Sequence, residues 1–194
     1  SALPLTAVAG LSTSEVAGLS ATQLAALSTR QIAALAATAI PTLTGTELAG
    51  LADTQFAALT AAQVTRLSTT QIAGLAPARL GALTTTQVKG LTATQLATLS
   101  TDQIAALSTR QVAALTAAAV TGLAATGIAS LAATQLAALS TTLMAALSTT
   151  EVAALSADQL AGLSTTQLGA LTATEVGALS TTQLAALSTG QIAA

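Results

Sequence analysis

The stretch LSTTQIAGL, residues 67–75, begins and ends at a leucine, and variants of it fill the chain. Close copies are LSTRQIAAL at 27–35, LSTDQIAAL at 99–107 and LSTTQLAAL at 179–187. Leucine occupies every eighth position from Leu3 to Leu187, which divides residues 3–194 into 24 octads without insertion or deletion. This period indicates a tandem-repeat protein. We expect one uninterrupted array over residues 1–194, without a linker or a domain boundary.

Each octad, numbered from its leucine, draws on few residue types. Position two is Ser or Thr in 18 octads, position five is Gln or Glu in 18, and position six is always aliphatic or Phe56. One continuous helix is excluded, because eight residues leave the leucines rotated by about 80° per octad and build no stable stripe. A β-solenoid is the remaining alternative. It is disfavoured because positions one and six have opposite parity along a strand and because 13 Gly and 3 Pro do not supply a corner in each octad.

The segment after each leucine has the pattern of a helix start. Ser68 suits the N-cap and Gln71 the N3 position of a capping box, while Leu67 and Ile72 suit a hydrophobic staple. Ser or Thr at position two and Gln or Glu at position five occur together in 16 octads. We therefore predict an all-α solenoid of 24 octapeptide repeats. Each octad contributes one short capped helix of about seven residues, held by stacking because it is too short to be stable alone.

The octad also predicts an inside and an outside. Position six and the following leucine are three residues apart, so we expect them to share the core face of one helix, with small residues at positions seven and eight allowing close approach. Position four should face water, since the charged residues Arg30, Asp102, Arg110 and Asp158 stand there. Leu99→Ala should cost ~2–5 kcal/mol, whereas Thr70→Ala should cost less than ~0.5 kcal/mol.

The number of octads per coil stays open. With two octads, 12 coils at helix-packing distance give a rod roughly 110 Å long; with three, 8 coils give roughly 75 Å. Some octads are irregular. Pro41 should distort its octad, LAATAIPT, whereas Pro77 falls at the favoured N1 position. The octads with Ala119 and Gly127 at position five should be the loosest.

The amino-acid composition of the chain excludes most kinds of active site. The chain has no Cys and no His, which excludes disulfides, thiolates, imidazole bases and His/Cys metal sites. Lys89, the only lysine, has no signature around it for a Ser–Lys arrangement. A carboxylate cluster is disfavoured, because the four glutamates replace Gln at a capping position: Glu15, Glu47, Glu151 and Glu175. We predict that the chain is not an enzyme and has no catalytic, cofactor-binding or metal-binding residues.

Nucleic acid and a membrane span are also not expected. The net charge is −2, and the nearest approach to a basic run has no interleaved aromatic residues: Arg66, Arg79, Lys89 and Arg110. Mean hydropathy is +0.74, but no apolar run approaches the ~18–20 residues of a spanning helix. The opening SALPLTAVAGL has no basic start, so no signal peptide is visible in it.

Octads of the LSTTQIAAL type resemble the Ala/Thr/Gln-rich repeat tracts of large bacterial exoproteins and adhesins, including the haem-utilisation-related class. The resemblance covers Leu3 to Ala194 and implies a structural segment that is extracellular or on the cell surface. Haem binding, which the name of that class suggests, is not expected here. His, Cys and Tyr, which could ligate the iron, are absent, and Met144 is the one methionine.

Two expectations of function follow from the sequence, one from its first and last octads and one from its regularly spaced threonines. The opening SALPLTAVAGL and the closing LSTGQIAA lack polar capping repeats, which a free solenoid needs. We therefore expect self-association end to end, through a heterologous contact that forms a filament, or continuation in a longer chain. The leading function is thus a structural segment that stacks axially into a rod or filament. The alternative is a binding module, whose rows of Thr and Ser would dock ice, a polysaccharide or a protein partner.

Overall fold

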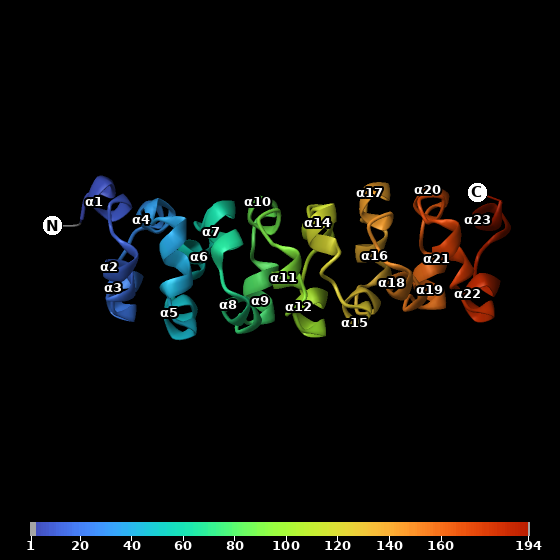
Figure 1. Cartoon of the computed structure of the whole chain (residues 1–194), viewed down its shortest axis with the longest axis horizontal. Coiled ribbons are helices and arrows are strands. Elements are labelled where there is room, and N and C mark those ends of the chain that lie inside the picture. Colours follow the sequence, from blue (N-terminus) through green and yellow to red (C-terminus); the bar gives the residue numbers. More distant parts are fainter. Residues whose placement is uncertain (1–2, 194) are drawn as a thin grey trace.

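The computed structural model describes residues 3–193, and within this range all regular secondary structure is helical, with no strand. The predicted all-α solenoid is confirmed (Figure 1). Its elements are α1 (Leu5–Ala9), α2 (Thr13–Ala17), α3 (Ala21–Ala25), α4 (Thr29–Ala34), the 3-10 helix η1 (Ala37–Thr42), α5 (Gly45–Gly50), α6 (Asp53–Ala57), α7 (Ala61–Arg66), α8 (Thr69–Ala73), α9 (Pro77–Gly81), α10 (Thr85–Val88), α11 (Ala93–Leu96), α12 (Thr101–Ala105), α13 (Thr109–Ala113), α14 (Ala117–Val120), α15 (Ala125–Ala129), α16 (Ala133–Leu136), α17 (Thr141–Met144), α18 (Thr149–Ala153), α19 (Ala157–Ala161), α20 (Thr165–Leu168), α21 (Ala173–Gly177), α22 (Thr181–Ala185) and α23 (Thr189–Ile192).

Each helix begins after its cap at position two and is shorter than predicted. In α8 the N-cap Ser68 is extended (φ −68°, ψ 158°) and the helix ends at Ala73. The Leu75 N–H then donates to the Ile72 carbonyl, 3.1 Å away and only three residues back. Such a bond tightens the last turn and closes it. The predicted length of seven residues was wrong for this reason, and the helices have four to six residues.

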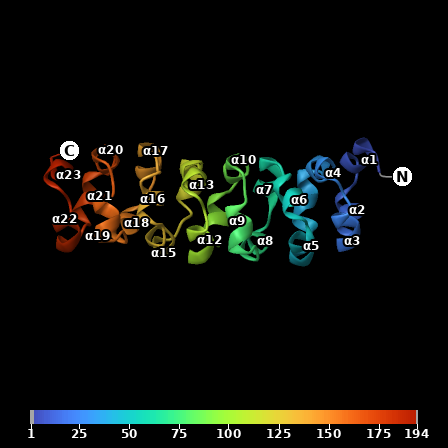
Figure 2. The same ribbon diagram turned by 180° about the vertical axis from the view of Figure 1, so that it is seen from behind.

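Three octads make one coil. Each element packs against the third element after it: α1 on α4, α2 on η1, α3 on α5, and so on along the chain. The 24 octads therefore form eight coils, which decides between the two lengths in favour of roughly 75 Å at helix-packing distances. Figures 1 and 2 show the coils stacked along one axis, with the two ends of the chain at opposite ends of the rod.

One hydrophobic cluster runs through the whole rod. Position six is buried in every coil except the last, and the leucines of position one are buried from Leu35 to Leu179 with the exception of Leu99. Leu99, predicted as a core position, packs against this cluster but is only partly buried. Leu107, which is 3% exposed, is the better core position. Charged residues at position four are exposed, as predicted.

The two stripes of the core face opposite ends of the rod. In the first coil Leu3 is 52% exposed while Val8 is fully buried. In the last coil Ile192 is 61% exposed while Leu179 is 7% exposed. The expectation that both positions share one helix face was wrong, because the leucine lies beyond the helix end in an extended corner; Leu35, for example, has φ −57° and ψ 139°.

Small residues let neighbouring coils approach, as expected. A Cβ on Gly122 would lie 1.9 Å from the Ala93 carbonyl oxygen of the previous coil. The octad with Pro41 forms the 3-10 helix η1, which confirms its distortion, and Pro77 is the first residue of α9. The predicted looseness at Ala119 and Gly127 stays a prediction.

Candidate functional site

All 16 capping boxes predicted from the sequence are formed. In α8 the Ser68 hydroxyl accepts from the Gln71 N–H at 3.1 Å, and Gln71 Oε1 accepts from the Ser68 N–H at 2.7 Å. Where alanine replaces the cap, half of the box survives: Gln55 Oε1 still accepts from the Ala52 N–H at 2.8 Å. A glutamine at position five thus accepts one N–H of the helix N-terminus even where no Ser or Thr precedes it.

The other end of the same glutamine side chain binds the previous coil. Gln63 Nε2 donates to the carbonyls of Leu35 at 2.8 Å and Ile32 at 2.9 Å. The Leu35 carbonyl lies at the corner between α4 and η1, and the Ile32 carbonyl lies in the last turn of α4. We call this column of amides the glutamine ladder. Its members, each bonded to the leucine carbonyl 28 residues earlier, are Gln31, Gln55, Gln63, Gln71, Gln87, Gln95, Gln103, Gln111, Gln135, Gln159, Gln167, Gln183 and Gln191.

The ladder explains why so many amides are buried. Gln63 is 1% exposed and Gln87 and Gln95 are each 2% exposed. A buried amide is costly unless its donor and its acceptor are both satisfied. Here the oxygen accepts the free N–H of one helix start, and the nitrogen donates to the leucine carbonyl that follows another helix and, in several coils, to a carbonyl of that helix's last turn. One side chain therefore caps two helices and joins two coils.

Arg79 continues the ladder with a different side chain. Its Nη2 donates to the carbonyls of Leu51 at 2.6 Å and Ala49 at 3.2 Å, the positions that a glutamine amide would use. Its Nε lies 3.3 Å from Asp53 Oδ1, and the guanidinium carbon lies 5.3 Å from the centre of the Phe56 ring. Nη1 is buried without a hydrogen-bond partner. Arg79 thus points inward, whereas Lys89 and the other arginines are exposed.

The four glutamates act as caps, as predicted, and two of them are also buried. Each accepts the N-cap N–H of its helix. At Glu15, bonds from the Ser12 backbone N–H and hydroxyl lower the pKa of the carboxyl. Glu151 and Glu175 are 4% and 6% exposed. Oε2 of Glu151 takes the cap bond, so Oε1 occupies the place of the glutamine nitrogen, where it is buried without a partner.

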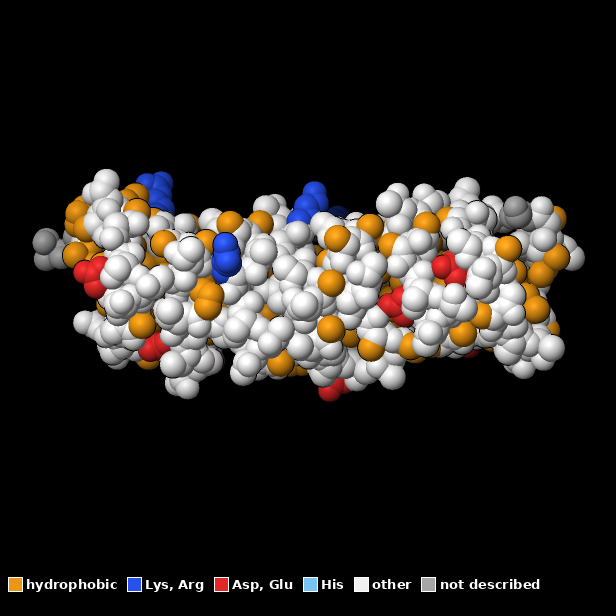
Figure 3. Space-filling view, viewed as in Figure 1, with side chains coloured by type: hydrophobic (Ala, Val, Ile, Leu, Met, Phe, Trp, Pro, Cys, Tyr) orange, Lys and Arg blue, Asp and Glu red, His pale blue; other side chains and the backbone are white. Residues whose placement is uncertain are grey.

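Residues 3–193 contain no cluster of His, Cys, Asp or Glu able to hold a metal ion. The same residues include no helix long and apolar enough to cross a membrane. Lys89, the C-cap residue of α10, is exposed. Figure 3 shows the few charged side chains scattered over an otherwise uncharged surface.

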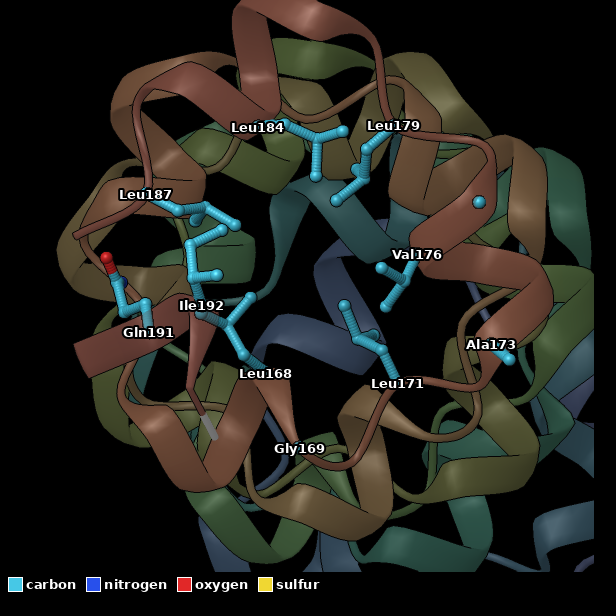
Figure 4. A pocket seen from close by; sticks show the side chains of 11 residues that line it. Leu168, Gly169, Leu171, Ala173, Val176, Leu179, Leu184, Leu187, Gln191 and Ile192 are labelled. Atoms are coloured by element: carbon cyan, nitrogen blue, oxygen red, sulfur yellow. The ribbon is translucent and has the colours of Figure 1, made fainter. Parts of the chain in front are cut away.

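The two apolar hollows of interest lie at the ends of the rod. The one at the C-terminal end has a volume of about 530 Å³ and is lined mainly by aliphatic side chains of the last coils, with Gln191 as its one polar side chain (Figure 4). The one at the N-terminal end, about 240 Å³, is lined by leucines of the first octads together with Ala26, Gln23 and Gln31. Neither lining contains a titratable group.

Exposed threonines at position four recur in one series of octads 24 residues apart: Thr22, Thr46, Thr70, Thr94, Thr142 and Thr166. The series is interrupted at Ala118 and Gly190. Its helices do not stay on one side of the rod, because α3, α5 and α8 lie along the lower edge of Figures 1 and 2 and α17 and α20 along the upper edge. The row therefore winds around the rod and gives no long flat face.

Sequence reasoning found the caps and missed the ladder. A capping box needs only an acceptor at N3, and a negative charge there is favoured by the helix dipole. Yet position five is Gln in 14 octads and Glu in 4. The preference for an amide over a carboxylate indicates a required donor, and this was the available signal.

Comparison with known proteins supports the repeat. The model of the ALTTAQ repeat family matches residues 72–109, 85–117, 144–173 and 165–194, which together cover half of the chain. Residues 82–87, ALTTTQ, differ from the name of that repeat only at Thr86. They hold the leucine, the N-cap and the ladder glutamine of one octad. A search of curated proteins finds no match to the chain.

Proposed function

This chain belongs to the ALTTAQ repeat family, and we propose that it is a structural segment of a bacterial surface or extracellular protein, extending axially as a stiff rod. The observation that carries the proposal is the glutamine ladder. It ties each coil to the one before it with hydrogen bonds buried inside the rod, in addition to a continuous leucine core. A segment that keeps the parts attached to its two ends at a fixed separation needs hydrogen bonds of this kind between successive coils.

Stiffness follows from where the bonds lie. Three successive octads start at different points around the axis, and the second to fourth ladder members, Gln55, Gln63 and Gln71, all bond to the coil before them. Bending the rod in any direction therefore stretches at least one buried hydrogen bond. A buried polar group that loses its partner costs ~1–3 kcal/mol, so bending is resisted at every coil.

The surface supports a passive role. Its charged residues are few and scattered (Figure 3), and no described group of side chains combines a nucleophile with a base. We propose on this ground that the chain is not an enzyme. A flat lattice such as ice would contact only part of the winding threonine row, so we rank the binding-module function second.

Two measurements test the proposal. Small-angle scattering of the folded monomer should give a rod with a length of roughly 75 Å, and protease or antibody added to intact host cells should reach the segment. A compact or flexible particle, or a segment accessible only after lysis, would contradict it. Clear thermal hysteresis would instead favour the binding module.

A further inference from the structure

Three basic side chains lie on three successive coils, in one column of stacked helices. Arg66 is the last residue of α7, Lys89 is the C-cap of α10, and Arg110 lies in α13. In this column α7 packs on α10 and α10 packs on α13, and all three helices lie in the upper half of the rod in Figure 2. The three side chains are exposed. We call them the basic patch.

A contact between two coils holds the first two cations near each other. The Thr65 hydroxyl of α7 donates to the Gly90 carbonyl at 2.7 Å, and a Cβ on Gly90 would lie 2.4 Å from the Ala61 carbonyl oxygen. Arg66 follows Thr65 and Lys89 precedes Gly90, so the two side chains start on either side of this contact. Like charges held in this way repel each other, and a bound anion removes the repulsion.

The rod itself supplies no counter-charge to the patch in the part that the structure describes. The ion pair found in residues 3–193 joins Arg79 to Asp53 and includes none of the three cations. Between residues 54 and 150 the one acidic residue is Asp102, which lies on α12 in the lower half of the rod in Figure 2. The chain as a whole has a net charge of −2, yet three of its five basic residues lie in this patch.

The surroundings of the patch are rich in hydroxyl groups. Exposed Ser and Thr residues begin both α10 and α13: Thr84, Thr85, Thr86, Ser108 and Thr109. Such hydroxyls both donate to and accept from a hydroxylated ligand. The one aromatic residue, Phe56, is buried and cannot stack on a nucleic-acid base. The large hydrophobic side chains exposed in residues 3–193 all lie in the first and last coils, so none beside the patch can insert into a membrane.

Beyond the axial role proposed above, we propose that the basic patch is a binding surface for an anionic polysaccharide, one that carries carboxylate or sulfate groups on its sugars. The three cations pair with the charged groups, and the neighbouring Ser and Thr hydroxyls bind the hydroxyls of the sugars. Successive coils are roughly 9–10 Å apart, so an extended polymer can lie lengthwise over all three. The rod would then be fixed along its side to a charged glycan.

Fluorescence anisotropy of a labelled alginate oligomer, in which every sugar carries a carboxylate, measures this binding. The folded chain should bind the oligomer at low salt and release it as salt is added, because exposed charge pairs are screened. A neutral dextran oligomer of equal length should bind about tenfold more weakly or not at all. Arg66→Gln should weaken alginate binding about two- to fivefold, the usual effect of one exposed charge pair.

A triple variant of the patch and a matched control extend the test. Arg66→Gln, Lys89→Gln and Arg110→Gln together should weaken alginate binding about tenfold or more.

The control makes the same change in net charge on the other side of the rod. Thr22→Asp, Thr46→Asp and Thr70→Asp alter exposed positions on α3, α5 and α8, which lie along the lower edge of Figures 1 and 2. Because charges are screened over ~8 Å at physiological ionic strength, the control should change binding less than about twofold. Circular dichroism verifies that both triple variants keep their helices.

Three results would overturn the proposal. The first is no alginate binding by the wild type at low salt and ~1 mM protein. The second is an equal loss of binding in the patch variant and in the control, which would show that net charge alone is responsible. The third is tighter binding of a single-stranded oligonucleotide with the same number of charges, which would assign the patch to nucleic acid.

Discussion

Replacing one ladder glutamine by glutamate separates the stability contributed by the hydrogen bonds between coils from the stability contributed by helix capping. In Gln63→Glu the new carboxylate keeps the bond from the Thr60 N–H but loses the donor to Ile32 and Leu35, at 2.9 and 2.8 Å. Two net hydrogen bonds of ~0.5–1.5 kcal/mol each disappear, and an unpaired acceptor is buried, so we expect a loss of about 2–4 kcal/mol at pH 7. Gln23→Glu is the matched control, because Gln23 caps its helix at 2.8 Å but bonds to no other coil in the described chain. It should change stability by less than ~0.5 kcal/mol.

Urea denaturation of both variants at pH 7 and at lower pH tests this reasoning. Burial against carbonyl oxygens raises the pKa of the introduced carboxyl above its unfolded value of about 4.3. The folded state then binds more protons than the unfolded state, so the destabilisation is fully present above the raised folded pKa and disappears below about pH 4. Equal losses at Gln63 and Gln23 would refute a separate inter-coil contribution, and a loss at Gln63 that does not change with pH would refute the donor explanation.

Three further substitutions follow from the same geometry, and thermal or urea unfolding measures each. Gly122→Ala should destabilise by ~2 kcal/mol or more, because its Cβ would clash with the Ala93 backbone of the previous coil, whereas Gly50→Ala, at the same octad position with open space around it, should stabilise slightly. Leu107→Ala should cost ~2–5 kcal/mol and Thr70→Ala less than ~0.5 kcal/mol; similar values would reverse the assignment of inside and outside. Glu151→Gln should stabilise by ~1 kcal/mol, because the amide restores a donor at the unpaired Oε1, and a destabilised variant would contradict this.

The helices were predictable because their signals are local. Ser68 and Gln71 are three residues apart, and a capping box acts over that distance whatever surrounds it. The coil size was not predictable, because it depends on the corner angle at each leucine and the residue types at the core position six show no alternation every three octads. Leu99 shows the same limit: its octad position predicts burial, but it is only partly buried in the folded array.

The sequence signals only the donor of the ladder, and it leaves the acceptor unidentified for a related reason. Gln63 and the Leu35 carbonyl are 28 residues apart, and they meet only once three octads have closed a coil. The acceptor is a backbone carbonyl, which every residue has, so the sequence marks only one partner of the bond. The expectation that the chain has no catalytic or metal-binding residues is a different matter: it rests on missing residue types, which need no geometry, and it stays a prediction.

The distribution of ladder donors divides the rod into a firm and a weak part. Every octad from residue 51 to residue 114 has a donor to the preceding coil, with Arg79 in place of glutamine in one of them. Among the five octads of residues 115–154 only Gln135 donates, because position five is otherwise Ala119, Gly127, Leu143 or Glu151. The carbonyls below these residues have no side-chain donor at the ladder position, so local opening should cost less there. Native-state hydrogen exchange should therefore be faster in α14–α18 than in α6–α13, although both parts have the same leucine core. Uniform exchange along the rod would show that the core alone sets local stability and that the ladder adds little to it.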